Sequence, residues 1–320
     1  MEQQEKLLKA IRKQMGKSDS INDVVATVLN ISYDAAHRRV SGKSKFSVDE
    51  AVTLCRHFRI SMDHVFEGDN KVLVEKTKEI TTFSDMELYF EQSTGYLNQY
   101  LDKPGATLYY SAKDIPLFYT IGGTLLSRFK LYVWMNLLIG KEQQEPFEKF
   151  VVPAPLLSYS SRMKAVYDTV AVSEIWNDTT INSTLQQILY FSESGLLSMK
   201  NALALYEEMR GLMAGVEQKS AENDPGFHVY YNELLILNNN VLVSDTEKLS
   251  LFVPYTMLGY FITEDQQTCR NAGAYFRHQI KNSKSLNLSG TRDRKIFFNR
   301  AYKKIDYYAE RLGHELDTLY

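Results

Sequence analysis

The segment NISYDAAHRRVSGKSK, residues 30–45, decides how the amino-terminal part of the chain folds. It begins with a short break, Asn30-Ile31-Ser32, and Ser is a residue type that caps a helix by accepting a hydrogen bond from its first turn. We expect the helix that follows to end before Gly42, because glycine tolerates a positive φ. Small residues and several cations share this short helix, so its two sides differ in chemistry.

Helical geometry separates the side chains of this segment into two faces. At 100° per residue, Ala36 and Val40 fall on the side expected to be buried, with Tyr33 near its edge and therefore expected to pack. The outward and flanking residues are Asp34, Ala35, His37, Arg38, Arg39 and Ser41. Small and polar outward side chains can enter a major groove about 12 Å wide, whereas bulky outward Leu or Phe would need a protein partner.

Short, capped helices are also expected on both sides of this segment. Apolar residues at helical spacing and capping residues predict five of them within residues 1–66. The predicted helices end at Gly16, run from Ser20 to Leu29, from Ser32 to Gly42, from Ser47 to Phe58, and from Ser61 to near Phe66. This pattern predicts a compact all-helical domain.

Residues 21–66 resemble the Cro/C1 (XRE) type of helix-turn-helix regulator. The positions that match are Val25-Ala26 before Leu29-Asn30-Ile31-Ser32, for LA..LG(I/V)S, then Gly42-Lys43, for GK, and later Ser47, Ile60-Ser61 and Phe66. Two positions depart from the pattern. Asn30 replaces the usual turn Gly, which Asn can do because it enters the left-handed region readily, and Val40 replaces a commonly acidic residue. The resemblance implies a lambda-repressor-like DNA-binding domain.

The helical faces and the resemblance together predict the residues that meet DNA. The expected base contacts are Asp34, Ala35, His37 and Arg38. Arg38 either makes the bidentate contact to guanine or binds a phosphate, and Asp34 either accepts from a cytosine amine or stabilises the helix amino terminus. The expected backbone contacts are Asn22, Ser32, Arg39, Lys43 and Lys45. The resemblance places Asn22 where the family usually has a phosphate-binding Gln, and the loop of Lys43 and Lys45 near the backbone.

The rest of the chain reads as a second, larger domain of mixed α/β class. Residues 67–87 are expected to be a linker or a connecting helix, and residues 88–320 the second domain. Strands are predicted at 106–112 and 171–176 and as a meander from Gly226 on, and 185–191 also fits a strand. Helices are predicted at 124–139, 198–217, 265–282 and 292–311.

No motif of this larger domain indicates catalysis. A Gly-rich phosphate loop, a nucleophile elbow and an HExxH pair are missing from the sequence, and Ser192–Gly195 lacks the GxSxG frame. The basic run at 291–304, TRDRKIFFNRAYKK, either binds an anion or forms an amphipathic helix with a solvated basic face, which we prefer. Aromatic residues either line a pocket or, as we prefer, pack: Tyr109, Tyr110, Trp176, Tyr230 and Tyr231. We expect no enzyme, metal or cofactor.

Charge and composition indicate a cytoplasmic protein. Residues 1–66 carry a net charge of +3 and the remaining 254 residues −5, as expected if the small domain meets a polyanion. Cys55 and Cys269 are far apart and lack metal spacing, so we expect reduced thiols. The amino terminus has no secretory pattern, and the most apolar run, 125–139, is interrupted by polar residues and shorter than the roughly 20 residues of a membrane span.

These observations predict a sequence-specific transcriptional regulator whose helix 33–41 lies in the major groove of double-stranded DNA. The second domain would dimerise, sense a small-molecule effector or meet a protein partner. A homodimer is expected because one small domain contacts few base pairs, and two read half-sites about one helical turn apart. The alternatives are an enzyme or nucleotide-handling domain tethered to DNA, and a helical module used only for protein interaction.

Overall fold

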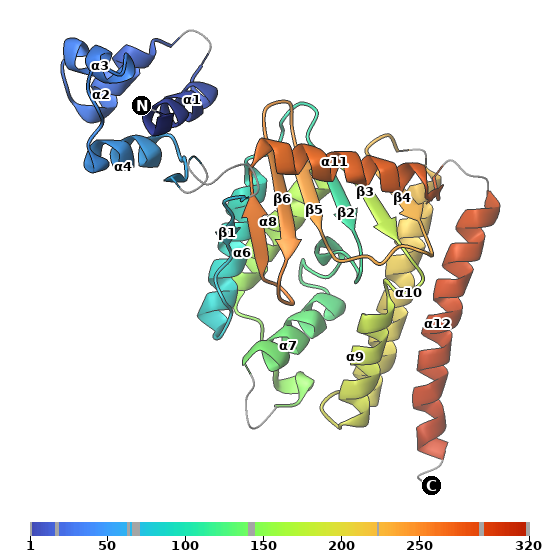
Figure 1. Cartoon of the computed structure of the whole chain (residues 1–320). Helices are drawn as coiled ribbons and strands as arrows, with labels where there is room; N and C mark the ends of the chain where they lie inside the picture. The colour runs from blue at the N-terminus through green and yellow to red at the C-terminus, as the bar shows by residue number, and fades with distance from the viewer. Residues whose placement is uncertain are drawn as a thin grey trace. The chain divides into compact units, whose positions relative to one another are not determined.

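The chain consists of two units, residues Met1–Leu73 and Val74–Tyr320, in a computed structural model. The structure describes residues 2–16, 19–62, 65, 71–139, 145–222, 224–287 and 291–317. The first unit is helical, and the second combines helices with one eight-stranded sheet (Figure 1). The predicted architecture, an amino-terminal helical region followed by a mixed α/β domain, is confirmed at this level.

The first unit packs short helices around a small apolar core. Its helices are α1 (Glu2–Gln14), α2 (Ile21–Leu29), α3 (Tyr33–Val40) and α4 (Val48–His57), as predicted. Of the fifth predicted helix the structure describes only Ser61, Met62 and Val65, so most of it lies outside the described residues. The buried core residues are Leu7, Ile11, Val25, Ala36, Leu54 and Cys55.

Local signals set the helix ends in this unit. Ser32 Oγ accepts a hydrogen bond from Ala35 N (3.3 Å), and Ser47 and Glu50 form the predicted capping box. Asn30 takes the left-handed conformation (φ 50°, ψ 49°) that ends α2, and Gly42 has a φ of 76° just after α3. Ser20 stands at the cap position of α2, but its side chain accepts no capping hydrogen bond.

The sheet of the second unit is mixed, in the order β1-β7-β6-β5-β2-β3-β4-β8. The three strands β2, β3 and β4 run parallel, and every other neighbouring pair is antiparallel. The strands are β1 (Glu75–Lys76), β2 (Thr107–Ser111), β3 (Ala171–Trp176), β4 (Phe227–Tyr231), β5 (Val241–Ser244), β6 (Leu249–Pro254), β7 (Tyr260–Thr263) and β8 (Lys284–Ser285).

Helices cover both faces of this sheet unequally. Val172 and Trp176 of β3 join the large apolar cluster on one face, and Ile175, which points the other way, joins a smaller cluster under α11. Figure 1 shows α11 crossing the strands. The helices are α6 (Phe83–Asn98), η1 (Leu117–Tyr119), α7 (Leu125–Ile139), η2 (Phe147–Lys149), α8 (Ala154–Thr169), α9 (Asn182–Glu193), α10 (Met199–Ala221), α11 (Gln266–Lys281) and α12 (Thr291–Asp317).

Most predicted elements of the second unit are confirmed, including β2, β3, α7, α10, α11 and α12. The strand considered at 185–191 is wrong, because these residues lie in α9. Leu185, Ile188 and Leu189 are buried at a spacing of three and four residues, which is the period of a helix. The predicted meander holds only for β5 to β7, since β4 pairs in parallel with β3.

The boundary between the units falls inside the span 67–87 where it was predicted, but part of that span is not a linker. The division falls between Leu73 and Val74, and β1 and the start of α6 lie within the span 67–87 that was expected to be a linker or connecting helix. Residues 74–87 therefore belong to the second unit. The short strand β1 was not recognised because only its pairing with Phe261 and Ile262 of β7 makes it a strand.

A buried carboxylate lies in the core of the second unit. Glu174 of β3 has no exposed surface and accepts hydrogen bonds from Trp176 Nε1 (2.6 Å), Tyr119 OH (3.3 Å) and Tyr167 OH. Burial raises the pKa of Glu174 to about 7, although the three hydrogen bonds favour the charged form. Ionisation of this group therefore opposes folding.

We expect Glu174→Gln to stabilise the second unit in a pH-dependent way. The folded carboxyl keeps its proton above its usual pKa of 4.5, so the wild type loses stability as the pH rises from about 4.5 to about 7. Gln cannot ionise, so the gain in unfolding free energy should grow over this window to about 3 kcal/mol at alkaline pH. Urea unfolding followed by Trp fluorescence at acidic and alkaline pH measures it, because both Trp residues lie in this unit.

Glu207→Gln on α10 is the matched control, since Glu207 is exposed. The unfolding free energy of Glu207→Gln should differ from that of the wild type by the same small amount at both pH values. A pH-independent effect of Glu174→Gln would contradict the expectation.

Candidate nucleic-acid interface

Helix α3 is docked on the first unit by one side only. Ala36 is fully buried in the core with Val25 of α2 and Leu54 of α4, and Val40 packs against the same cluster. The turn at Asn30 redirects the chain between α2 and α3, and the cap at Ser32 starts the new helix. The predicted buried side of α3 is therefore the buried side in the structure.

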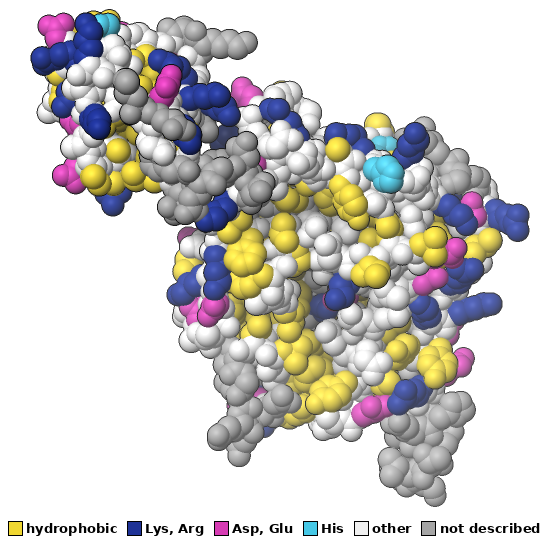
Figure 2. Space-filling view, viewed as in Figure 1, with side chains coloured by type: hydrophobic (Ala, Val, Ile, Leu, Met, Phe, Trp, Pro, Cys, Tyr) yellow, Lys and Arg dark blue, Asp and Glu magenta, His cyan; other side chains and the backbone are white. Residues whose placement is uncertain are grey.

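The other side of α3 is exposed and polar. Asp34, His37 and Arg38 are exposed, and within the described part of the chain their side chains have no hydrogen-bond or ion-pair partner. Ala35 is half-buried between them. Figure 2 shows Lys and Arg side chains gathered on this unit around the position of α3 in Figure 1. The exposed side can thus donate to and accept from a ligand.

Tyr33 belongs to this exposed side, so the expectation that it packs at the buried edge is wrong. Its side chain is 51% exposed, and its hydroxyl accepts a hydrogen bond from Asn22 Nδ2 (3.3 Å). Tyr33 is the first residue of the helix, where few neighbouring turns can cover it. Asn22 is half-buried, and its Oδ1 has no partner among the described residues.

Arg39, a predicted backbone contact, is engaged in an ion pair within the first unit. Its Nε and Nη2 donate to the two carboxylate oxygens of Glu50 (3.0 and 2.7 Å), and its Nη1 donates to Ala35 O (3.2 Å). This bidentate ion pair, with both side chains about one-fifth exposed, joins α3 to the first turn of α4. The hydrogen bond from Arg39 lowers the pKa of Glu50 against the opposing effect of burial.

Gln4 of α1 holds the segment that follows α3, and sequence analysis did not identify it. Its Nε2 donates to Arg39 O (2.7 Å) and Ser44 O (3.0 Å), and its Oε1 accepts from Phe46 N (3.0 Å). No sequence pattern could have found it, because these partners lie 35 to 42 residues away. The loop that carries Lys43 and Lys45 is therefore pinned at two points.

The remaining predicted contact residues lie at the two ends of α3. Ser32 is exposed, but its Oγ is engaged in the cap. Lys43 and Lys45 are exposed beyond the carboxyl end, with no partner within the residues that the structure describes. The structure thus brings Asp34, His37 and Arg38 together on one face with two free ammonium groups beyond it.

The second unit offers a different kind of site. A groove of about 490 Å³ lies beside β1, β7 and α6. It is lined by Glu75, Lys76, Thr77, Gln92, Tyr96 and Ile262, among others. It contains one carboxylate, and Glu75 already accepts a hydrogen bond from Tyr96 OH. Across the described ranges, no cluster of His, Cys, Asp or Glu could hold a metal ion, and no helix is long and apolar enough for a bilayer.

We expect Glu50→Gln to loosen the contact between α3 and α4. The ion pair requires ionised Glu50, whose pKa lies below its usual 4.5, so its contribution is present above that pH and is lost as the pH falls below it. The local opening free energy of α3 should fall by about 1–2 kcal/mol at neutral pH, and amide hydrogen exchange measures it. Asp49→Asn, one residue earlier and exposed, should leave exchange unchanged. If Glu50→Gln and Asp49→Asn changed amide exchange in α3 equally, the ion pair between Arg39 and Glu50 would not be what holds α3 to α4.

We expect Gln4→Ala to release the loop after α3. The variant leaves Phe46 N and Ser44 O without the hydrogen bonds from Gln4, whereas Arg39 O still accepts from Gly42 N (3.0 Å), and the loss should cost about 2 kcal/mol of local stability. Hydrogen exchange of the Phe46 amide should become faster, whereas Gln14→Ala at the exposed end of α1 should leave it unchanged. If the exchange rate of the Phe46 amide were the same in Gln4→Ala as in the wild type, the loop would be held by other contacts.

Comparison of the chain with family models, with curated proteins and with solved structures finds no match. The resemblance of residues 21–66 to the Cro/C1 (XRE) pattern therefore rests on the residues of this chain alone. Its functional meaning is a matter for proposal.

Proposed function

We propose that the chain is a sequence-specific DNA-binding transcriptional regulator in which α2, the turn and α3 act as a helix-turn-helix. The observation that carries this proposal is the docking of α3, with Ala36 buried and Asp34, His37 and Arg38 exposed and unpaired. A helix about 10–12 Å across fits a major groove about 12 Å wide. The Cro/C1 (XRE) resemblance of residues 21–66 supports the same function.

We assign DNA-contact roles to the residues of the exposed face. Arg38 has the free guanidinium that can make two hydrogen bonds to guanine, and Asp34, Ala35 and His37 flank it as further base contacts. Tyr33 joins them because its ring is exposed at the amino end of α3. Phosphates would be bound by Lys43, Lys45, Asn22 and Ser32, whereas Arg39 positions α3 through Glu50.

The second unit is proposed to dimerise or to sense an effector. Two copies of the first unit would read two half-sites, which raises affinity without new contacts in each half. The groove of about 490 Å³ beside α6 lies in the volume range of small-molecule pockets, and its lining combines apolar surface with charged and amide side chains that could orient an effector. Cys55 and Cys269 are buried free thiols, which suits the reducing cytoplasm proposed as the location.

We expect Arg38→Ala and Lys43→Ala to weaken DNA binding in different ways. Selection of bound duplexes from random DNA with the full-length chain should enrich one sequence. Arg38→Ala should then cost about 1–3 kcal/mol on that sequence and relax the preference at one base pair, because a base contact is lost. Lys43→Ala should weaken binding to all sequences equally and make the dependence on salt shallower by about one unit of slope.

Arg12→Ala is the charge-matched control for this experiment. Arg12 is exposed on α1, eight residues and about 12 Å along the helix from Gln4, which contacts the loop after α3. It should bind like wild type. Equal binding by Arg38→Ala and wild type would remove Arg38 as a base contact. Selection that enriches no sequence would favour a helical module used for protein interaction.

A further inference from the structure

Positive charge in the second unit is concentrated in one stretch of sequence. Residues 266–304 contain ten Lys and Arg and a single acid, Asp293, for a net charge of +9, although the whole chain carries −2. The other 281 residues therefore carry −11. This stretch comprises α11, β8 and the first half of α12. It does not include the proposed recognition helix α3, so the proposed function does not account for its charge.

Helix α11 presents a stripe of exposed cations to solvent, of which Arg270 donates a hydrogen bond to Gln266 Oε1 (2.8 Å). It contains no Asp or Glu, and Arg270, Arg277 and Lys281 follow one another at seven and four residues, which places them on one side. A neighbouring side of the helix, about 90° around its axis, carries Cys269 and Phe276 and is buried on the sheet. All three cations are exposed, and none has a carboxylate partner among the residues described. At 1.5 Å per residue the stripe is about 16 Å long.

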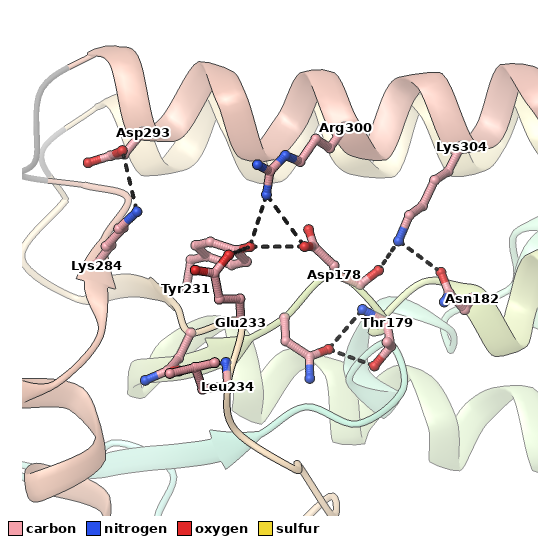
Figure 3. Close-up of polar contacts among 12 residues, drawn as sticks. Asp178, Thr179, Asn182, Tyr231, Glu233, Leu234, Lys284, Asp293, Arg300 and Lys304 are labelled. Atoms are coloured by element: carbon pink, nitrogen blue, oxygen red, sulfur yellow. Dashed lines mark hydrogen bonds and ion pairs between the residues drawn. The ribbon is translucent and has the colours of Figure 1, made fainter.

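Helix α12 uses some of its charged residues to dock. Figure 3 shows Asp293, Arg300 and Lys304 pointing from the helix toward the strands. Asp293 Oδ1 lies 3.9 Å from Lys284 Nζ, and Arg300 Nη1 donates to Tyr231 OH (3.2 Å). Lys304 Nζ donates to Asn182 Oδ1 (3.2 Å). These side chains hold α12 at the carboxyl ends of β3 and β4.

Other cations of α12 are not engaged in this way. Arg292, Lys295 and Lys303 are exposed and have no partner within the described part of the chain. Arg292 and Lys303 are eleven residues apart, which brings them back to the same side of the helix after three turns. They form a second stripe of about the same length as the one on α11.

The two stripes belong to one surface. Asn232 Nδ2, after β4, donates to Asn282 O at the end of α11 (3.1 Å), and Lys284 of β8 approaches Asp293 at the start of α12. The end of α11 and the start of α12 therefore meet at the edge where β8 pairs with β4. Figure 2 shows Lys and Arg side chains over both helices on the same visible face. We call this the basic surface: Arg270, Arg277, Lys281, Arg292, Lys295 and Lys303.

We propose that the basic surface is a second DNA-contacting surface, which binds phosphates without reading sequence. This inference rests on the proposed function, because the first unit would hold DNA at a high effective concentration for the second. DNA carries one negative charge per roughly 1.7 Å of its axis, so each stripe of about 16 Å can meet several phosphates. A second copy of the chain is disfavoured as occupant, since a two-fold contact would oppose like charges.

A charge-removal experiment tests the inference. The variant Arg270→Gln/Arg277→Gln/Lys281→Gln is compared with Lys113→Gln/Lys149→Gln/Lys200→Gln, which removes three exposed cations outside the stretch. Binding of each full-length chain to a long duplex of random sequence is measured by fluorescence anisotropy over a salt series, after circular dichroism has shown that both are folded. The first variant should lose about tenfold in affinity at low salt, and its salt slope should become shallower by about 2–3. The control should match wild type.

The α12 stripe gives an independent variant, Arg292→Gln/Lys295→Gln/Lys303→Gln, with the same expected loss. The salt series is then repeated with the stripe substitutions placed in an Arg38→Ala chain. This measures the contribution of the basic surface to DNA binding apart from that of the proposed recognition helix. If selection enriches a sequence but the stripe variants bind random DNA like the control, the basic surface does not meet DNA, and an acidic protein becomes the better partner. If the stripe variants lose affinity although no sequence is enriched, the basic surface stands and the role of α3 is overturned.

Discussion

The ion pair between Arg39 and Glu50 is the contact on which the exposed face of the first unit depends. It joins the last turn of α3 to the capping box of α4, where Glu50 also accepts from Ser47 N (2.9 Å). Gln4 adds α1 to the same junction through Arg39 O. Because Ala36 is small, the apolar contact of α3 with the core is limited, and these charge-assisted hydrogen bonds orient the helix. Arg38, the next residue, is left outside the junction.

The charged groups of the second unit are unevenly distributed between its core and its surface helices. Its core is largely aromatic and apolar, and the polar groups buried there include Lys130 and Glu174, whose partners are Tyr and Trp hydrogen-bond donors. Exposed cations without a carboxylate partner among the described residues gather on α11 and α12, and the stretch 266–304 holds a single acid. Together with the exposed face of α3, this gives the chain two surfaces suited to a polyanion, one with a mixed set of donors and acceptors and one with cations alone.

Local rules explain why much of the fold could be predicted. Ser32, Asn30 and Gly42 act on neighbouring residues, so the ends of α3 were correct. Residues 185–191 were misread because a short apolar run fits a strand and a buried helix equally, and in the structure Leu185, Ile188 and Leu189 are buried on one side of the helix α9. The ion pair of Arg39 was not predicted, because its partner Glu50 lies on another helix.

The sequence by itself determined the helical first region, the side of α3 that is buried, the exposure of Arg38 and the mixed α/β class of the rest. These follow from capping, periodicity and composition, which act over a few residues. Only the tertiary structure decided that Arg39 is an internal partner, that Gln4 pins the loop, that Tyr33 is exposed, and that the cations of α11 and α12 share a surface. Those outcomes depend on which distant side chains meet in space, and side-chain spacing along the chain does not contain that information.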